Sequence, residues 1–593
     1  MPFLPDLIEG NQSRSVVDVF GGYNHNLKIA DGEWYDEENL TAAHYPMFSQ
    51  RRPRSVYLEA NGSLHGILAK DALAYVEGDK LYYNGLHVSG VKLKDSGPKQ
   101  LVSMGAYLCI FPDNVYVNTA DLTDCGSMDA HYLSPDGAEI TYTPCRVTGE
   151  EYTSEELNAS SSEPSDPANG EHWLDTSGDV HVLKQYSSSS GMWVQIPTVY
   201  TKIRCTGIGQ LFREYDGVEI GGVTYAGENA ELSAQLADLN GSFVIQGRGD
   251  DYIIVIGLID QKYVQTSGNI YVGRSIPRMT SVCEANNRLW GCYYGLVDGK
   301  AVNEIYACKQ GDFRNWNCFM GLSTDSYTVS VGSDGEFTGC IAYLGYPLFF
   351  KENCIHKISG SMPANYQLTT TACRGVQRGS ERSLAIVNEV LYYKSRSDVC
   401  AYDGSLPTGI SSQFGTDLYY DAVAGAHGGK YYVSMRDSKG MWSLFVYDTQ
   451  RNVWHREDGM HAVGFTAWGD EIFFIDGDGN RIIAENGTVG APEELVRWRA
   501  VSGMIGYELI DHQYVSRFNL RMRLSNGAKC ALAIEYDSSG DWIEQGVIYG
   551  HGTDSFVIPV IPQRCDHFRV RLQGEGDIKI YSIAKIIEQG SDA

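Results

Sequence analysis

The feature that most constrains this chain is a run of short strands and tight turns between residues 428 and 454. A Gly-Gly pair opens the run. Three predicted strands follow, separated by two polar turns: strands at 431–433, 442–447 and 453–454, and turns at 436–440 and 448–452. Strands joined by short polar turns are typical of an antiparallel meander. An ordinary hairpin is the alternative for this single stretch.

The same run resembles a kelch repeat, because Gly-Gly, Tyr-Asp and a later Trp follow in that order. In that family the glycines allow close packing of backbones, and the Trp fills the space between blades. Comparable patterns occur at residues 64–121 (two blades), 287–316, 340–358, 384–403, 421–454 and 461–486. The repeats predict an all-β chain with a β-propeller of about six or seven blades. The expected blade-core residues are Trp316, Trp442, Asp448 and Trp454.

Composition agrees with a β-rich fold. The 593 residues include 65 Gly, 39 Tyr and 10 Trp, and only residues 228–239 have apolar residues at helical spacing. The net charge of −27 argues against a sequence-reading DNA-binding protein and against binding to an anionic membrane. The 14 Cys form no CxxC pair, so we expect reduced, mostly buried thiols and no zinc site.

The blade rhythm stops at about residue 125. Residues 150–171 are acidic and rich in Ser and Pro, which indicates a loop, and Trp173 and Trp193 then bracket a predicted hairpin. This unit resembles a small module of phage tail and fibre proteins, some relatives of which look like carbohydrate-binding modules. Trp173 and Trp193 are therefore either glycan contacts or the core of a mini-domain. Residues 125–275 are expected to form an inserted, projecting domain.

The last hundred residues alternate apolar and polar side chains along nearly every predicted strand. Phe518, Leu520 and Met522 alternate with Arg517, Arg521 and Arg523, which predicts a C-terminal β-sandwich. The expected division of the chain is an N-terminal arm and closing strand (1–60), first blades (61–124), the insertion (125–275), remaining blades (276–490) and the sandwich (491–593).

Two segments carry a second resemblance. Residues 20–54, with FGGYN, DGEW, NLT, YP and RRPR, and residues 561–592 are similar to virion structural proteins of tailed phages and prophages of Gram-positive hosts. The resemblance implies a β-propeller protein of the tail nozzle or hub, assembled in the host cytoplasm into the virion. It implies a ring of six copies below the connector, contacts with connector or adaptor and fibre proteins, and genomic DNA that passes without specific binding.

Within that ring, the basic residues are expected at subunit contacts rather than in the bore: Arg51, Arg52 and Arg54, and Arg517, Arg521 and Arg523. The alternative function is a glycan-binding or glycosidase-like propeller of the tail tip, which would need paired carboxylates facing one cavity. No catalytic motif, metal site or cofactor site is evident, so the chain is expected not to be an enzyme. The sequence shows neither a signal peptide nor an apolar run that could span a membrane.

Overall fold

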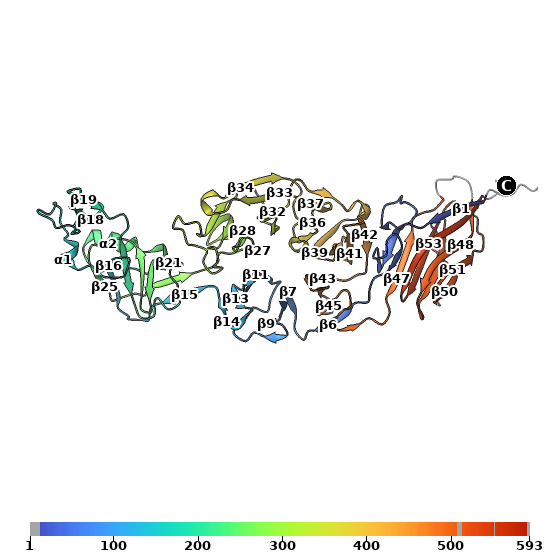
Figure 1. Cartoon of the computed structure of the whole chain (residues 1–593), viewed down its shortest axis with the longest axis horizontal. Coiled ribbons are helices and arrows are strands. Elements are labelled where there is room, and N and C mark those ends of the chain that lie inside the picture. The colour runs from blue at the N-terminus through green and yellow to red at the C-terminus, as the bar shows by residue number, and fades with distance from the viewer. Residues whose placement is uncertain (1–11, 507–512, 551, 590–593) are drawn as a thin grey trace, which may run out of the picture.

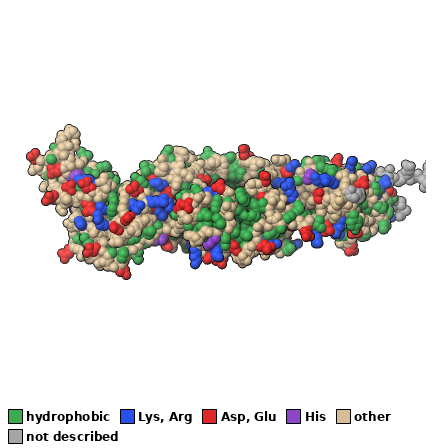
Figure 2. Space-filling model, turned by 60° about the horizontal axis from the view of Figure 1, so that its bottom comes forward, with side chains coloured by type: hydrophobic (Ala, Val, Ile, Leu, Met, Phe, Trp, Pro, Cys, Tyr) green, Lys and Arg blue, Asp and Glu red, His purple; other side chains and the backbone are tan. Residues whose placement is uncertain are grey.

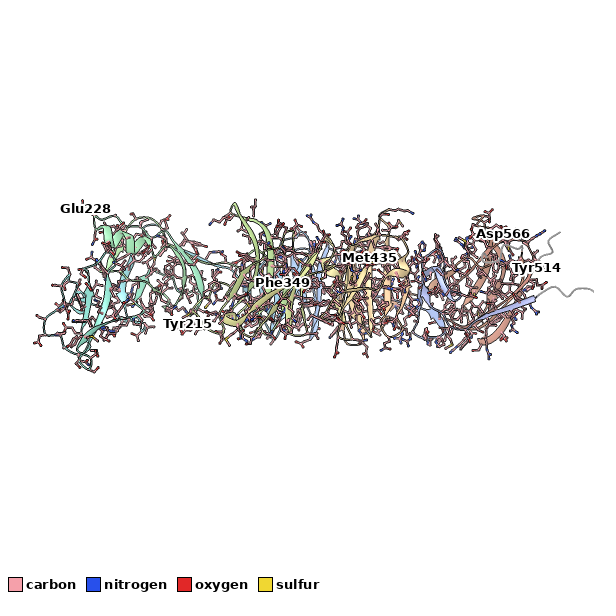
Figure 3. The ribbon with its side chains drawn as sticks, turned by 90° about the horizontal axis from the view of Figure 1, so that it is seen from above. Tyr215, Glu228, Phe349, Met435, Tyr514 and Asp566 are labelled. Atoms are coloured by element: carbon pink, nitrogen blue, oxygen red, sulfur yellow. The ribbon has the colours of Figure 1, made fainter. Side chains whose placement is uncertain are left out.

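The computed structural model describes residues 12–506, 513–550 and 552–589, and it shows a long molecule built of three units. Figure 1 shows them in a row: an inserted domain at one end, a β-propeller in the middle and a β-sandwich at the other end. Figure 3 shows the same order from above, with Glu228 and Tyr215 in the insertion, Phe349 and Met435 in the propeller, and Tyr514 and Asp566 in the sandwich. The predicted all-β fold class is confirmed.

The propeller has seven blades, each an antiparallel sheet. Blades 1 to 3 consist of β7 (Leu64–Lys70), β8 (Ala72–Glu77), β9 (Lys80–Tyr83) and β10 (Leu86–His87); β11 (Gln100–Met104), β12 (Tyr107–Phe111), β13 (Val115–Asn118) and β14 (Asp121–Ser127); and β27 (Ser281–Glu284), β28 (Leu289–Val297), β29 (Lys300–Ala307) and β30 (Tyr327–Ser330). Blades 4 and 5 consist of β31 (Gly339–Tyr343), β32 (Tyr346–Lys351), β33 (Cys354–Ser359) and β34 (Gln367–Ala372); and β35 (Ala385–Val387), β36 (Val390–Lys394), β37 (Val399–Tyr402) and β38 (Thr408–Gly409).

The last two blades complete the ring. Blade 6 consists of β39 (Tyr419–His427), β40 (Lys430–Asp437), β41 (Trp442–Asp448) and β42 (Val453–Arg456). Blade 7 combines β43 (Ala462–Trp468), β44 (Glu471–Asp476) and β45 (Arg481–Ala484) with β6 (Ser55–Glu59) and β46 (Ala491–Pro492). Because β6 pairs with β45 and β43 lies beside β7, the start and end of the propeller are held together. Closure of this kind leaves few free sheet edges.

Blade 6 shows why these residues form blades. Gly428 and Gly429 both have positive φ in the turn from β39 to β40, a conformation that glycine adopts without steric cost. Alternating apolar side chains of the strands then enter the cores on either side of the blade. Trp454 is 1% exposed; its ring packs against Phe414 and Tyr447, and its indole N–H donates to the Ile410 carbonyl of blade 5. The predicted position of Trp454 between blades is therefore correct.

The insertion lies between β14 of blade 2 and β27 of blade 3. Its strands form three sheets: β15 (Ala130–Leu133), β26 (Tyr271–Arg274), β21 (Gly217–Gly221) and β22 (Gly241–Val244); β23 (Gly247–Gly249), β24 (Tyr252–Ile256), β20 (Tyr200–Arg204), β16 (Ile140–Cys145) and β25 (Tyr263–Gln265); and β17 (His172–Asp175), β18 (Val182–Ser187) and β19 (Met192–Gln195). It also contains the helices α1 (Ser154–Leu157) and α2 (Ala230–Ala237). At its base, Asn315 of blade 3 donates to the Tyr215 carbonyl and accepts from Gly217 N–H.

The sandwich consists of two six-stranded sheets. One contains β1 (Gln12–Val17), β4 (Leu40–Thr41), β5 (Phe48–Gln50), β53 (Ile578–Gln589), β48 (Gln513–Leu524) and β51 (Gly552–Pro559). The other contains β2 (Gly22–Tyr23), β3 (Glu33–Glu38), β47 (Arg497–Ser502), β52 (Phe568–Glu575), β49 (Lys529–Tyr536) and β50 (Ile543–Tyr549). The predicted alternation holds on β48, where Phe518, Leu520 and Met522 are buried and the three arginines between and beside them are exposed.

The N-terminal region corrects the expected division of the chain. Residues 1–60 were expected to be an arm with one closing strand, but β1 to β5 are strands of the sandwich and only β6 belongs to the propeller. The reason is apolar burial: Phe20, Trp34 and Phe48 pack into the same core as Phe518 and Phe568. These strands are two to six residues long and interrupted by turns, so their pattern is too short to distinguish from a loop.

Three smaller features complete the description. The Asp476–Asn480 stretch is a turn between β44 and β45, in which the Asp476 carboxylate accepts from the N–H groups of Asp478 and Gly479. Twelve of the 14 Cys are buried and all 14 are free thiols. In the described residues, no helix has the length and apolarity needed to cross a membrane.

Candidate functional site

A cavity with a volume of about 880 Å³ lies in the centre of the propeller. The axis of the ring runs along the line of sight in Figure 1, and the insertion and the sandwich project from opposite sides of the rim. The walls come from the inner strands of the blades and are mostly apolar, as with Ile67, Leu101, Val282, Ile341 and Phe465. Figure 2 shows hydrophobic side chains gathered over this middle part of the molecule. We call this cavity the channel.

Polar groups enter the channel mainly from blades 5 and 6. A short 3-10 helix before β35, Glu381–Ser383, supplies Glu381 and Arg382, and the bulge in β39 supplies Asp421. Arg382 donates from Nη1 to the Val463 carbonyl of β43 at 2.7 Å. Burial lowers the pKa of Arg382, and the nearby Glu381 carboxylate offsets part of that effect. The guanidinium nevertheless remains charged at neutral pH.

The two carboxylates of the channel lie beside the same backbone residue. Gly379 N–H donates to Glu381 Oε1 at 2.9 Å, and a Cβ atom at Gly379 would lie 2.8 Å from Asp421 Oδ1. Asp421 Oδ2 forms an ion pair with Arg436. Both carboxylates therefore face one cavity, with lone pairs available to hydroxyl donors. None of the sequence motifs marked these residues; only their positions next to inner strands would have identified them.

The four residues predicted for the blade core divide into two groups. Trp316 is buried between blades 2 and 3, and Asp448 is buried where its carboxylate accepts from two turn N–H groups. Trp442, in contrast, is only half-buried and lines the channel, stacked on His461 with ring centroids 3.9 Å apart. Trp442 is therefore wrong as a blade-core residue, because it begins β41 at the end of the blade rather than in its middle.

The first basic cluster was predicted to make subunit contacts, and burial corrects that prediction for two of its members. Arg54 is 2% exposed and pairs with Glu457, Asp458 and Glu485. Arg51 is 5% exposed and pairs with Glu493. These carboxylates follow strands of blades 6 and 7, so both arginines fasten the N-terminal segment to the propeller. Arg52 is exposed.

The acidic partners of Arg54 lie close to one another, so the arginine does not balance all of their negative charge. Burial raises the pKa of the Glu485 carboxyl well above its ordinary value, although the Arg54 cation beside it acts in the opposite direction. Removing one partner of such a buried pair leaves an uncompensated charge in a low-dielectric setting, which is strongly destabilising. Arg51 and Arg54 are therefore structural residues of the junction between propeller and sandwich.

The second basic cluster is placed where a partner could reach it. Arg517, Arg521 and Arg523 are exposed on one face of β48, the strand between β53 and β51. Within the described residues none of the three forms an ion pair, and exposed Val557 of β51 pairs with Asn519 beside them. This surface, which we call the basic face, lies on the outer side of the sandwich.

The two tryptophans of the small hairpin unit pack against each other, while the buried core of the unit consists of Leu157, Leu174 and Leu183. Trp173 is buried, its indole N–H donates to the Ser160 carbonyl, and the Lys184 ammonium lies 4.6 Å from the ring centroid. Trp193 is half-buried and packs edge-on against Trp173, with Tyr186 on another side. A sugar cannot stack on a ring that is already covered, so the suggested glycan contact at Trp173 is wrong. In the described part of the chain, no group of His, Cys, Asp and Glu could hold a metal ion.

Comparison with known proteins gives structural matches only. No protein-family model and no curated protein matches the chain. It is similar to the structure of an exo-β-1,3-galactanase from Phanerochaete chrysosporium with β-1,3-galactotriose, at TM-score 0.22 and 8% identity over 51% of this chain and 94% of that one. Another match is a glycoside hydrolase, at TM-score 0.19 and 9% identity over 52% and 96% of the two chains. A third is a family 43 arabinoxylan arabinofuranohydrolase from Bacillus subtilis in complex with cellotetraose, at 0.16 and 9% over 52% and 95%.

These solved structures correct one expectation. The chain was expected not to be an enzyme, but the structures it is similar to are glycoside hydrolases, and the expectation is withdrawn. At TM-scores of 0.16 to 0.22 the likeness assigns no activity, substrate or residue to this chain. The propeller itself is established by the order and pairing of the strands.

Proposed function

We propose that this protein is a structural component of a bacteriophage tail, a nozzle or hub subunit that assembles into a ring. The observation that carries the proposal is the composition of the sandwich. The two segments that resemble phage virion proteins lie more than 500 residues apart in the sequence, and their described parts meet in this one unit. β5 of the first segment pairs with β53 of the second, and β3 of the first pairs with β47, which in turn pairs with β52 of the second. Residues 590–592 of the second segment lie outside the described residues.

The basic face supports an assembly role for the same unit. The whole chain carries a net charge of −27, and the insertion alone, residues 129–280, has nine Lys and Arg against 21 Asp and Glu. The three arginines of the basic face therefore complement the acidic surface of another copy. The propeller suits a supporting role, since its sheets are joined in a ring and its loops remain free for neighbouring proteins. The bore of the proposed ring is distinct from the channel inside each propeller.

The test is the assembly state of the purified protein and of a charge-reversal variant. We expect a closed ring by electron microscopy and light scattering, and mostly monomer for the triple variant Arg517→Glu, Arg521→Glu, Arg523→Glu. The control reverses three exposed cations of the blades, Arg378→Glu, Arg396→Glu and Lys439→Glu, and should leave the ring intact. Duplex DNA should not bind at physiological salt, because the acidic protein offers few phosphate contacts. A monomer at high concentration would contradict the proposal.

A second candidate function is saccharide binding, and the channel favours it. A cavity of about 880 Å³ with apolar walls, an aromatic pair at Trp442 and His461 and two carboxylates is large enough for a sugar. Paired carboxylates facing one cavity are also what a glycosidase requires. Binding and hydrolysis measured with an oligosaccharide panel test this candidate, and the absence of both would reject it.

A further inference from the structure

Arg382 is held across the channel by a single hydrogen bond. It begins in the 3-10 helix of blade 5, and its guanidinium reaches β43 of blade 7, past the intervening blade 6. A guanidinium carries five N–H donors. For Arg382, the bond to the Val463 carbonyl is the one hydrogen bond that the described residues provide, and they provide no ion pair. The other donors are available to a group inside the channel.

Three arginines that are buried more deeply make the contrast clear. Arg54 contacts three carboxylates, Arg274 pairs with Asp216, and Arg288 donates to three backbone carbonyls, of Cys308, Asp325 and Ser323. A desolvated cation is costly unless it is paired, and in these cases the fold supplies the partners. Arg382 differs from these three: it is half-buried, the described residues give it one carbonyl partner, and its side chain lines a cavity.

The groups around Arg382 limit the chemistry of a ligand. A guanidinium binds a carboxylate or a phosphate through two parallel N–H bonds. Glu381 adds a negative charge to the same side of the channel, and Asp421 adds a second one that its ion pair with Arg436 partly offsets, so a doubly charged phosphate would be repelled more strongly than a singly charged carboxylate. The same two carboxylates accept hydrogen bonds from hydroxyl groups, and the apolar wall with Trp442 can cover a carbon skeleton. A carboxylate, several hydroxyls and an apolar face occur together in a sugar acid.

We propose that the channel binds a sugar acid, with Arg382 holding the ligand carboxylate, Glu381 and Asp421 accepting from ligand hydroxyls, and Trp442 covering one ring face. This inference rests on the saccharide-binding candidate and names its ligand class and its specificity residue. It does not depend on the assembly role, since the basic face is on the sandwich and the channel is in the propeller.

The experiment compares acidic and neutral sugars of otherwise equal structure. Glucuronate and galacturonate, as monosaccharides and short oligomers, are titrated against the full chain by calorimetry beside glucose and galactose. We expect the acids to bind at least tenfold more tightly than the neutral sugars, because a guanidinium forms two parallel charge-assisted hydrogen bonds with a carboxylate, which a neutral sugar lacks. Added salt should weaken binding of the acids only.

Variants assign the effect to Arg382. Arg382→Met keeps the length of the side chain and should weaken binding of the acids at least tenfold. Arg382→Lys keeps the charge without the two parallel donors and should have an intermediate effect. The control is Arg378→Met, an exposed arginine that pairs with Glu336 outside the channel, and it should bind like the unchanged protein. Thermal melts establish whether each variant is folded. If Arg382→Met does not fold, the binding measured with Arg382→Lys decides the test.

The possible outcomes separate this inference from the function on which it rests. Equal binding of acidic and neutral sugars, or unchanged binding of the acids by both Arg382 variants, would overturn the sugar-acid inference and leave saccharide binding in place. No binding of any sugar would overturn both. Binding of a peptide through its terminal carboxylate, lost in Arg382→Met while the sugar acids do not bind, would replace the sugar acid by a peptide.

Discussion

The propeller and the sandwich consist mostly of antiparallel sheets, but they differ in how far apart in the sequence their paired strands lie. Six of the seven blades are each made from one continuous stretch, so their strands pair with neighbours a few residues away. In the sandwich, β53 pairs with β1, β5 and β48, and β3 pairs with β47, so strands from the two ends of the chain pair with each other within each sheet. The propeller is therefore a series of local units, whereas the sandwich depends on contacts over more than 450 residues.

This difference predicts how a substitution or deletion in each unit should affect its folding. A blade can lose packing and still keep its own hairpins, since each hairpin is closed by a short turn. A sheet of the sandwich loses whole strands when either end of the chain is removed. Folding of the sandwich must also pay the closure entropy of a very long loop, which the folded propeller in between greatly shortens.

The largest expected effect comes from removing the N-terminal strands. A chain that begins at Arg51 keeps β6 but lacks β1 to β5, and with them the core residues Trp34 and Phe48. We expect the sandwich to lose its folded state while the blades persist. Limited proteolysis with mass spectrometry should cut throughout residues 497–589, and the blades should remain resistant.

A matched control removes more residues without dividing any remaining sheet. Replacing residues 129–280 with a Gly-Ser linker deletes the three sheets of the insertion and leaves the pairing of propeller and sandwich unchanged. Both units should then stay resistant to protease. Unfolding of the propeller in this variant, or an intact sandwich in the truncated chain, would show that the comparison is wrong.

The next effect tests packing between blades. Trp454→Ala removes a ring that is 1% exposed and should lower the free energy of unfolding by about 3–5 kcal/mol. Trp442→Ala removes a ring of the same size from the channel wall and should cost only about 1 kcal/mol. Denaturant melts followed by circular dichroism measure both. Equal losses would show that the channel wall is as well packed as the blade interface.

The smallest expected effect is a pH dependence confined to blade 4. Burial, together with the Lys351 cation, lowers the pKa of His356 to about 4, and its ring nitrogens lie 2.9 Å from Ser333 Oγ and 2.8 Å from Thr370 Oγ1. Because the unfolded chain binds a proton near pH 6.5 and the folded chain does not, stability falls as the pH decreases from about 6.5 to 4, by up to about 3 kcal/mol.

His356→Gln should remove this slope, and His87→Gln, at an exposed histidine of blade 1, should keep it. Melting temperatures measured every half pH unit between 4 and 7 give the two slopes. An unchanged slope in His356→Gln would place the acid sensitivity elsewhere in the molecule.

The same contrast explains what the sequence could predict. The blades repeat a local pattern, so all seven were found, and the alternation on β48 identified the sandwich. The N-terminal strands were missed because pairing such as Trp34 with Ser502 has no local signal. The burial of Arg51 and Arg54 was not predicted because their acidic partners lie about 400 residues away in the sequence. The sequence around the two arginines is the same whether or not such partners exist. Arg382 was missed because its significance comes from the cavity around it.

The closing strand has a consequence for synthesis on the ribosome. β6 ends at Glu59, and its partner β45 begins at Arg481, so roughly 400 residues separate the two. At about 5–20 residues per second, the ribosome needs on the order of 20–80 s to supply that partner. During that interval β6 lacks its partner β45, and the edges of β3 and β5 that later pair with β47 and β53 are open to another nascent chain. These strands, which are made long before their partners, are therefore the part of the described chain most open to chaperone capture or to mispairing.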